Sequence, residues 1–262
     1  MARLRQQSAA LVELFDNPKA FIRALNDLFE LYSDRVHRAG QAGEPPPLLQ
    51  AYHVPFPLLR QVVLDLSPNA SEDADRTLAL CDILWAESFL EPRLLAISML
   101  GKAPLKRMTS ILESIQRWAQ STTEERLLNA LAEQGLSRVS QENPAQLLEQ
   151  TRRWLEAEEL SLKRLGLQSL LQLIANPDFE NLPALLHLLT PYVRIAPLPL
   201  RPDVLNLISA LAHRSPRETA YFLRQNLEAP ENPDAALLIR QSLRHFPDEN
   251  QASLRAALRQ IK

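Results

Sequence analysis

The basic side chains are the residues of this chain best suited to binding chemistry, because arginine and lysine pair with phosphate or carboxylate oxygens. Lys163 and Arg164 are adjacent within an otherwise apolar stretch. If folding aligns them with Arg126 and Arg201, these side chains form a concave track that holds phosphate groups without reading a base sequence. The alternative is a solvated face on which the charges pair with acidic side chains one helical turn away.

Histidine and cysteine usage does not support a metal site or an activated nucleophile. The five histidines lie far apart, and none has a second histidine, a cysteine or a glutamate at metal-ligand spacing. Cys81 is the only cysteine, and its apolar neighbours predict a buried structural thiol. Five scattered glycines cannot build the loops that cradle nucleotide phosphates. We therefore expect no metal and no cofactor.

Two other groups of side chains are better explained by structure than by chemistry. The acidic residues at 156, 158 and 159 open a predicted helix, where negative charge complements the N-terminus. Trp85, Trp118 and Trp154 each belong to an apolar helical stripe. This pattern favours core packing over a platform on which bases stack.

Charge and hydropathy limit the possible partners. The 262 residues include 29 Lys and Arg against 31 Asp and Glu, so only a local basic patch could bind nucleic acid. The first residues lack the apolar region of a secretory signal, and no stretch has the ~18 uncharged apolar residues of a membrane span. We therefore expect a cytoplasmic protein that does not contact a membrane.

The composition favours helices. Leucine contributes 52 residues against 18 for valine and isoleucine together, and β-branched residues are the ones that favour strands. Capping residues followed by proline mark helix starts, because proline at the first helical position has no N–H to lose. Such pairs are Asn17-Pro18, Asn143-Pro144, Ser215-Pro216 and Asn232-Pro233, and Glu218 extends the third into a capping box.

Apolar residues recur at three- and four-residue spacing between these marks, which predicts about a dozen amphipathic helices. We expect them over residues 9–38, 57–66, 71–87, 91–101, 104–120, 123–136, 144–156, 158–175, 181–193, 202–213, 216–227, 233–245 and 249–261.

The helices are predicted to form an all-α fold. From about residue 71 they come in pairs with the period of HEAT or armadillo arrays, which predicts a right-handed α-solenoid. The alternative is an irregular bundle of the same helices. We expect an N-terminal helical segment with a proline-rich linker over residues 1–50, and the solenoid over 51–262. The linker covers residues 39–57, and a second irregular stretch covers 194–202.

Several segments resemble one family when they are taken together. They are residues 54–62 (VPFPLLRQV), 84–87 (LWAE), 91–97 (EPRLLAI), 161–167 (SLKRLGL) and 211–216 (LAHRSP). They are similar to the AlkD-type DNA alkylation-repair glycosylases, a family of HEAT-like repeats that excises cationic alkylated bases such as 3-methyladenine and 7-methylguanine. The resemblance spans about residues 50–230 and rests on pattern more than on identity.

The resemblance implies positions for the functional residues of that family. Its functional arginine falls on Arg164, and its W-W-D-x-V-D run falls on residues 124–129. The catalytic aspartate position is then occupied by Asn129, and the tryptophan position beside the base by Glu125. The second tryptophan position falls near Ser209. Because asparagine cannot supply the negative charge that stabilises the developing sugar cation, we expect base excision to be weak or absent.

Three functions follow as hypotheses. The first is duplex DNA binding through a concave basic track centred on Arg164, with Lys163, Arg126 and Arg201 on further phosphates. The second is a non-catalytic scaffold whose concave face binds a protein or peptide. The third is an active glycosylase in which Glu125 supplies a displaced carboxylate.

Overall fold

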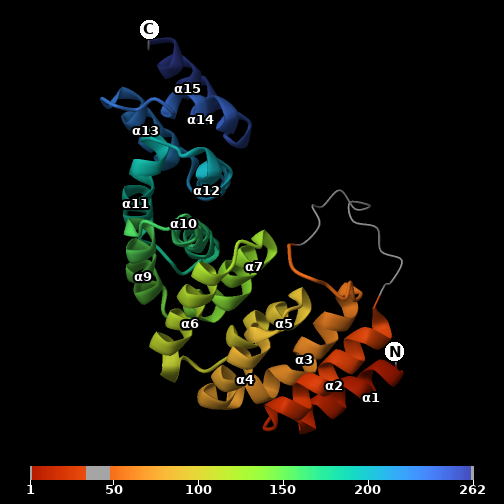
Figure 1. The fold of residues 1–262 in the computed structure, drawn as a ribbon. Helices are drawn as coiled ribbons and strands as arrows, with labels where there is room; N and C mark the ends of the chain where they lie inside the picture. The colour runs from red at the N-terminus through yellow and green to blue at the C-terminus, as the bar shows by residue number, and fades with distance from the viewer. Residues whose placement is uncertain (1, 34–47, 261–262) are drawn as a thin grey trace. The chain divides into compact units, whose positions relative to one another are not determined.

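The computed structural model describes residues 2–33 and 48–260 (Figure 1). Contacts within the chain divide it into two compact units, which are Met1–Glu142 (unit 1) and Asn143–Lys262 (unit 2). The boundary lies between a short helix and the Asn143-Pro144 pair that starts the next one.

Unit 1 consists of helices that pack in two layers. In one layer α1, α3, α5 and α7 follow one another, and in the other α2, α4 and α6 do. The bounds are α1 (Ala2–Glu13), α2 (Pro18–Tyr32), α3 (Phe56–Glu72), α4 (Ala74–Ala86), α5 (Leu90–Leu100), the 3-10 turn η1 (Leu105–Arg107), α6 (Met108–Ser121), α7 (Glu125–Ala130), the π-helical turn η2 (Leu131–Gly135) and α8 (Ser137–Glu142).

Unit 2 repeats this arrangement. Its helices α10, α12 and α14 form one layer, and α11, α13 and α15 form the other, while α9 packs on α10. The bounds are α9 (Pro144–Glu156), α10 (Leu160–Ala175), α11 (Leu182–Arg194), the 3-10 turn η3 (Leu198–Leu200), α12 (Arg201–Arg214), α13 (Pro216–Glu228), α14 (Ala235–Ser242), the 3-10 turn η4 (Leu243–His245) and α15 (Asp248–Gln260).

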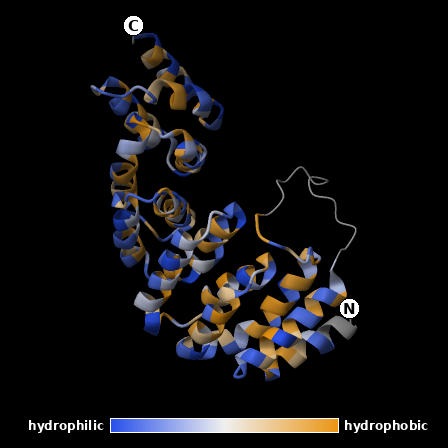
Figure 2. Cartoon of the chain, viewed as in Figure 1, coloured by the Kyte–Doolittle hydropathy of each residue, from blue (hydrophilic) through white to orange (hydrophobic). Residues whose placement is uncertain are grey.

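The sequence in which the helices of each unit contact one another confirms the predicted fold class. Helices contact the next helix and the next but one along the chain, as in a helical-repeat solenoid. Apart from an isolated bridge between Gln50 and Phe89, the described residues form helices, turns and loops, so the fold is all-α. Hydrophobic and hydrophilic residues alternate along the same helices in Figure 2. This pattern lets each helix bury one face against its neighbours.

Three of the predicted helix starts are confirmed. Helices α2, α9 and α13 begin at Pro18, Pro144 and Pro216. The capping box predicted at Ser215 is wrong, because the Ser215 side chain makes no capping hydrogen bond. The fourth prediction is wrong, because α14 begins at Ala235 after Asp234 rather than at Pro233. The cause lies in Asn232, whose side-chain amide donates hydrogen bonds to the carbonyls of residues 226 and 227 at the end of α13, and therefore does not cap α14.

Other boundaries depart from the prediction for local reasons. The helix expected over 9–38 is two helices, α1 and α2, because the chain turns at residues 14–17 before the Asn17-Pro18 start; residues 34–38 lie outside the described part. Residues 39–47 of the predicted linker also lie outside it. The described remainder is tied to the helices, since the Leu90 N–H donates to the Gln50 carbonyl at 2.8 Å. The irregular stretch at 194–202 contains η3 and the start of α12.

The predicted core residues are confirmed. Trp85, Trp118 and Trp154 are buried, and the first two rings stack with centroids 4.7 Å apart. Cys81 is also buried, and burial raises the pKa of its thiol. The division of the chain at residue 50 stays a prediction. No helix in the described ranges is long and apolar enough to cross a membrane.

Candidate nucleic-acid interface

Arg164 is fixed in orientation by two acceptors on neighbouring elements. It lies in the first half of α10, where its Nε donates to Asp203 Oδ2 at 3.2 Å and its Nη2 donates to the Pro199 carbonyl at 2.8 Å. The arginine side chain is 21% exposed. Since Asp203 belongs to α12 and Pro199 to η3, this guanidinium joins three elements of unit 2 and keeps one part of its surface in solvent.

The carboxylate that holds Arg164 is itself shared. Asp203 as a whole residue is 8% exposed. Its second oxygen accepts a hydrogen bond from Gln168 Nε2 at 3.2 Å. Gln168 lies one turn after Arg164 on α10, so both residues reach the same acid across the helix interface. A nearly buried carboxylate needs such partners, because an uncompensated charge at this depth is costly.

Arg201, another arginine of the predicted track in unit 2, is also held by a carboxylate and a backbone carbonyl. Arg201 begins α12, and its Nη2 lies 2.7 Å from Asp234 Oδ1 and 3.2 Å from the Ala196 carbonyl. The second oxygen of Asp234 accepts from the Ala196 N–H at 2.9 Å. Both side chains of this ion pair are 21% exposed. Arg201 therefore secures the 194–202 stretch to the start of α14.

Lys163 differs from the two arginines. It precedes Arg164 on α10 and is half-buried, and its backbone N–H donates to the Glu159 carbonyl in the first turn. A lysine stem can lie along apolar surface while the ammonium group stays in water. Lys163, Arg164 and Arg201 thus belong to the same helix layer of unit 2, on α10 and α12.

The remaining predicted residues lie on α7 in unit 1. Glu125 is exposed, while Arg126 and Asn129 are half-buried. The acid with the clearest structural role is the preceding one, Glu124, which is buried and caps α7. Its carboxylate accepts a hydrogen bond from the Leu48 N–H at 2.6 Å.

The predicted site is therefore divided between the units. Three of its basic residues share one layer of unit 2, whereas the fourth, Arg126, belongs to unit 1 together with Glu125 and Asn129. A single track made of all four basic residues stays a prediction.

A family model described as DNA alkylation repair enzyme matches residues 48–193, which is more than half of the chain. The chain belongs to this family. The predicted resemblance is thus confirmed, and the family points to a function related to DNA alkylation repair. A search of the curated proteins found no match.

Most of the candidate residues lie within the range that the family model matches. Glu125, Arg126, Asn129, Lys163 and Arg164 lie inside the matched range, whereas Arg201 and Ser209 lie beyond it. Ser209, near which the resemblance places the second tryptophan of the family, lines a pocket on α12.

Sequence reasoning missed the residues that hold the basic side chains in place. Asp203 and Asp234 were not candidates, because only the packed structure brings each within reach of its arginine. Arg214 lies in one of the segments that carry the family resemblance. Its guanidinium donates to backbone carbonyls around the C-terminus of α10, those of Leu173, Ile174, Asn176, Pro177 and Phe179. A cation there complements the negative end of the helix.

The acceptors on this layer decide what the arrangement can do chemically. An arginine held by a carboxylate through one edge presents a guanidinium of fixed direction, which suits a phosphate oxygen better than a mobile side chain does. Acid–base chemistry is less well provided for, because the acids on this layer are engaged as ion-pair partners.

Proposed function

We propose that this protein binds duplex DNA through the α10–α12 layer of unit 2, with Arg164 and Lys163 on backbone phosphates, and that it excises alkylated bases poorly or not at all. Arg201 is a further phosphate contact in this proposal, and a role for Arg126, on α7 of unit 1, stays a prediction from the sequence. The observation that carries it is the fixed, partly exposed guanidinium of Arg164 in a chain that belongs to a DNA alkylation repair family.

The geometry of Arg164 supports binding because orientation is established before DNA arrives. Two acceptors hold the guanidinium, so little side-chain entropy remains to be lost when a phosphate binds. Asp203 offsets part of the positive charge, which lowers the attraction to DNA at long range but leaves short-range hydrogen bonding in place. Adjacent Lys163 supplies a second cation for the same backbone segment.

The expectation that base excision is weak or absent rests on residues of α7. If Asn129 occupies the position of the family's aspartate, its amide offers a dipole but no negative charge to the sugar cation that forms as the glycosidic bond breaks. Glu125 is exposed, and water around an exposed carboxylate weakens its effect on a nearby charge. Excision under single turnover should therefore stay near the uncatalysed rate.

Fluorescence anisotropy of a labelled duplex tests the binding proposal. Replacing Arg164 alone leaves Asp203 without its cation, so the informative variants are Lys163→Gln and the double variant Arg164→Gln/Asp203→Asn. We expect each to weaken binding by about threefold to thirtyfold, the effect of losing one charge-assisted contact to phosphate. The matched control is Arg153→Gln on α9, whose side chain is 66% exposed and pairs with Glu149.

Equal binding by wild type, Lys163→Gln and the double variant would reject this layer as the DNA surface. The excision part is tested separately, by incubating alkylated duplex with excess protein and measuring released 7-methylguanine. Release well above the protein-free rate, lost in Glu125→Gln, would support the active-glycosylase alternative instead.

One feature of unit 1 favours the scaffold alternative. Phe56 and Leu64 on α3 are 75% and 56% exposed, and both line a mainly apolar pocket that α5 and η2 complete. Exposed apolar side chains gathered in this way are typical of surfaces that contact proteins. Absence of duplex binding even at low salt would leave this alternative as the preferred one.

A further inference from the structure

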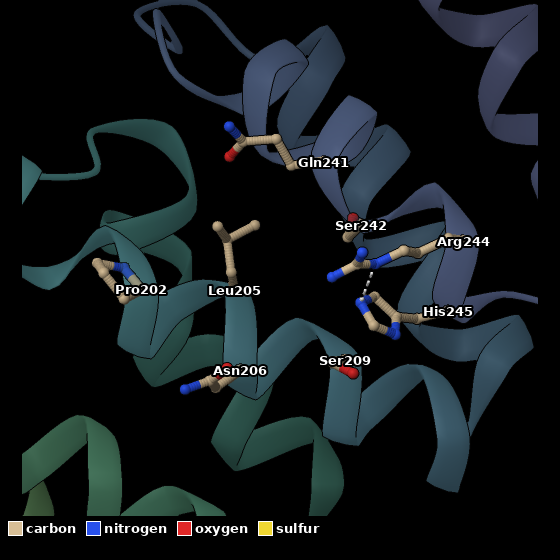
Figure 3. A pocket seen from close by; sticks show the side chains of 8 residues that line it. All are labelled: Pro202, Leu205, Asn206, Ser209, Gln241, Ser242, Arg244 and His245. Atoms are coloured by element: carbon tan, nitrogen blue, oxygen red, sulfur yellow. Dashed lines mark hydrogen bonds between the residues drawn. The ribbon is translucent and has the colours of Figure 1, made fainter. Parts of the chain in front are cut away.

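A second polar site lies in unit 2, between α12 and the end of α14. It is a pocket of about 500 Å³ (Figure 3). Eight residues line it: Pro202, Leu205, Asn206, Ser209, Gln241, Ser242, Arg244 and His245. Figure 3 shows Leu205 pointing into the space that Arg244 and His245 border from η4.

The cationic side of the pocket is organised by a hydrogen bond between neighbouring residues. Arg244 Nε donates to His245 Nε2 at 3.2 Å. This bond uses one edge of the guanidinium and requires an unprotonated Nε2, so the neutral His245 ring carries its proton on Nδ1. The two terminal nitrogens of Arg244, which is exposed, lie on the pocket side of this bond.

A second histidine lies beside His245. The His213 ring centroid lies 6.0 Å from that of His245, and His213 Nδ1 donates to the Ser209 carbonyl at 2.7 Å. The pKa of His245 is lowered, first by burial and then by the charges of Arg244 and His213. An anion bound beside Arg244 would offset the charge of that guanidinium and favour the protonated form of His245.

The rest of the lining suits an oxyanion with several acceptor atoms. Asn206 and Gln241 offer amide N–H groups and Ser209 offers a hydroxyl, from the two helices on either side. None of the eight lining residues is acidic. A planar carboxylate has two acceptor oxygens, whereas a phosphate group has at least three and can therefore accept from more donors.

We propose that this pocket binds a phosphate group, with Arg244 as its ion-pair partner and hydroxyl and amide groups of the lining as hydrogen-bond donors. The phosphate belongs either to a small phosphate monoester or to a phosphodiester of a nucleic acid backbone. This site is separate from the Arg164 ion pair, and the inference does not rest on duplex binding through α10.

The test follows the histidine ring resonances of the intact protein by NMR while inorganic phosphate replaces chloride at constant ionic strength. We expect the resonances of His245 and His213 to shift and saturate, and the pKa of His245 to rise. Arg244→Gln should weaken the apparent affinity for phosphate about tenfold or more. Arg240→Gln is the matched control, because Arg240 is an exposed arginine on α14 that does not line the pocket.

Two further probes distinguish the sources of the phosphate. Deoxyadenosine 5′-monophosphate tests a monoester, and a short duplex tests the diester. Competition by the monophosphate alone identifies a small-molecule site, and competition by the duplex that is lost in Arg244→Gln identifies a backbone contact. The proposal is overturned if phosphate leaves the His245 resonance unchanged, or if Arg244→Gln and Arg240→Gln bind phosphate equally.

Discussion

Arg164 and Asp203 form an ion pair across the interface of α10 and α12, with Nε 3.2 Å from Oδ2 and only 21% and 11% of the two side chains exposed. The pair has a structural part and a binding part. Its carboxylate anchors the arginine, whose side chain stays partly exposed at the protein surface. These two roles predict different behaviour for single and double variants.

The structural role predicts that Arg164→Gln lowers the free energy of unfolding by about 2 kcal/mol, because it leaves Asp203 without its cation in a nearly buried position. The double variant Arg164→Gln/Asp203→Asn should recover part of this loss. Urea unfolding followed by circular dichroism measures both. A single variant as stable as the wild type would show that the pair contributes nothing to the interface.

Gly101 lies where the backbones of α5 and η2 approach closely in unit 1. A Cβ at this position, which caps α5, would lie 2.0 Å from the carbonyl oxygen of Gln134 in η2. Because backbone atoms cannot move aside as a flexible side chain does, Gly101→Ala should cost about 3 kcal/mol or more, despite the better helix propensity of alanine.

Gly135 provides the control for this prediction. A Cβ there would meet side-chain atoms of Ile97 and Ile115 at 3.5 Å, which is ordinary contact. Gly135→Ala should therefore change the melting temperature little. Equal melting temperatures for the Gly101 and Gly135 variants would contradict the close approach of α5 and η2.

At position 214 we expect arginine to stabilise the folded protein and lysine not to replace it. Its guanidinium donates to several carbonyls around the C-terminus of α10, including that of Asn176 at 2.7 Å. A single ammonium group cannot reach the same set, so Arg214→Lys should destabilise the protein nearly as much as Arg214→Gln, by about 2 kcal/mol. Thermal unfolding measures this, with exposed Arg217→Gln as control. Full stability of Arg214→Lys would show that charge alone suffices.

The pKa of His245 is predicted to lie below its ordinary value of 6.5, because of burial and the charges of Arg244 and His213. Arg244→Gln should raise it, and Arg240→Gln should not. A lowered pKa means that the unfolded chain binds the proton more readily than the folded protein does. The contribution of this residue to stability therefore falls as the pH drops below about 6.5. If an NMR titration gave the His245 ring the same pKa in Arg244→Gln as in the wild type, the charge of Arg244 would not be a cause of the lowered pKa.

Much of the fold was predictable because local signals determine it. Cap-proline pairs such as Asn17-Pro18 and Asn143-Pro144 start helices where the sequence places them, and the apolar spacing around Trp118 identifies a buried face. The Asn232-Pro233 prediction failed because the asparagine side chain bonds to the end of the preceding helix. A capping residue can serve either of two helices, and the sequence does not state which.

The candidate site was less predictable because it depends on contacts between distant residues. The basic residues could be named from the sequence, but the partners of Arg164 and Arg201 lie 39 and 33 residues further along the chain. Which acid each arginine meets depends on the rotation of each helix about its axis. An error of two residues in helix phase turns a side chain by about 200° and would replace Asp203 by a different neighbour.

The salt dependence of duplex binding tests most directly whether the α10–α12 layer binds DNA phosphates. Each phosphate contact releases counterions, so the logarithm of the binding constant should fall with the logarithm of salt concentration by about 0.9 per contact. We predict measurable binding at low salt and a slope that is shallower by about one contact in Lys163→Gln, with Arg153→Gln as the control. No binding at low salt, or the same slope in wild type and Lys163→Gln, would contradict phosphate binding by this layer.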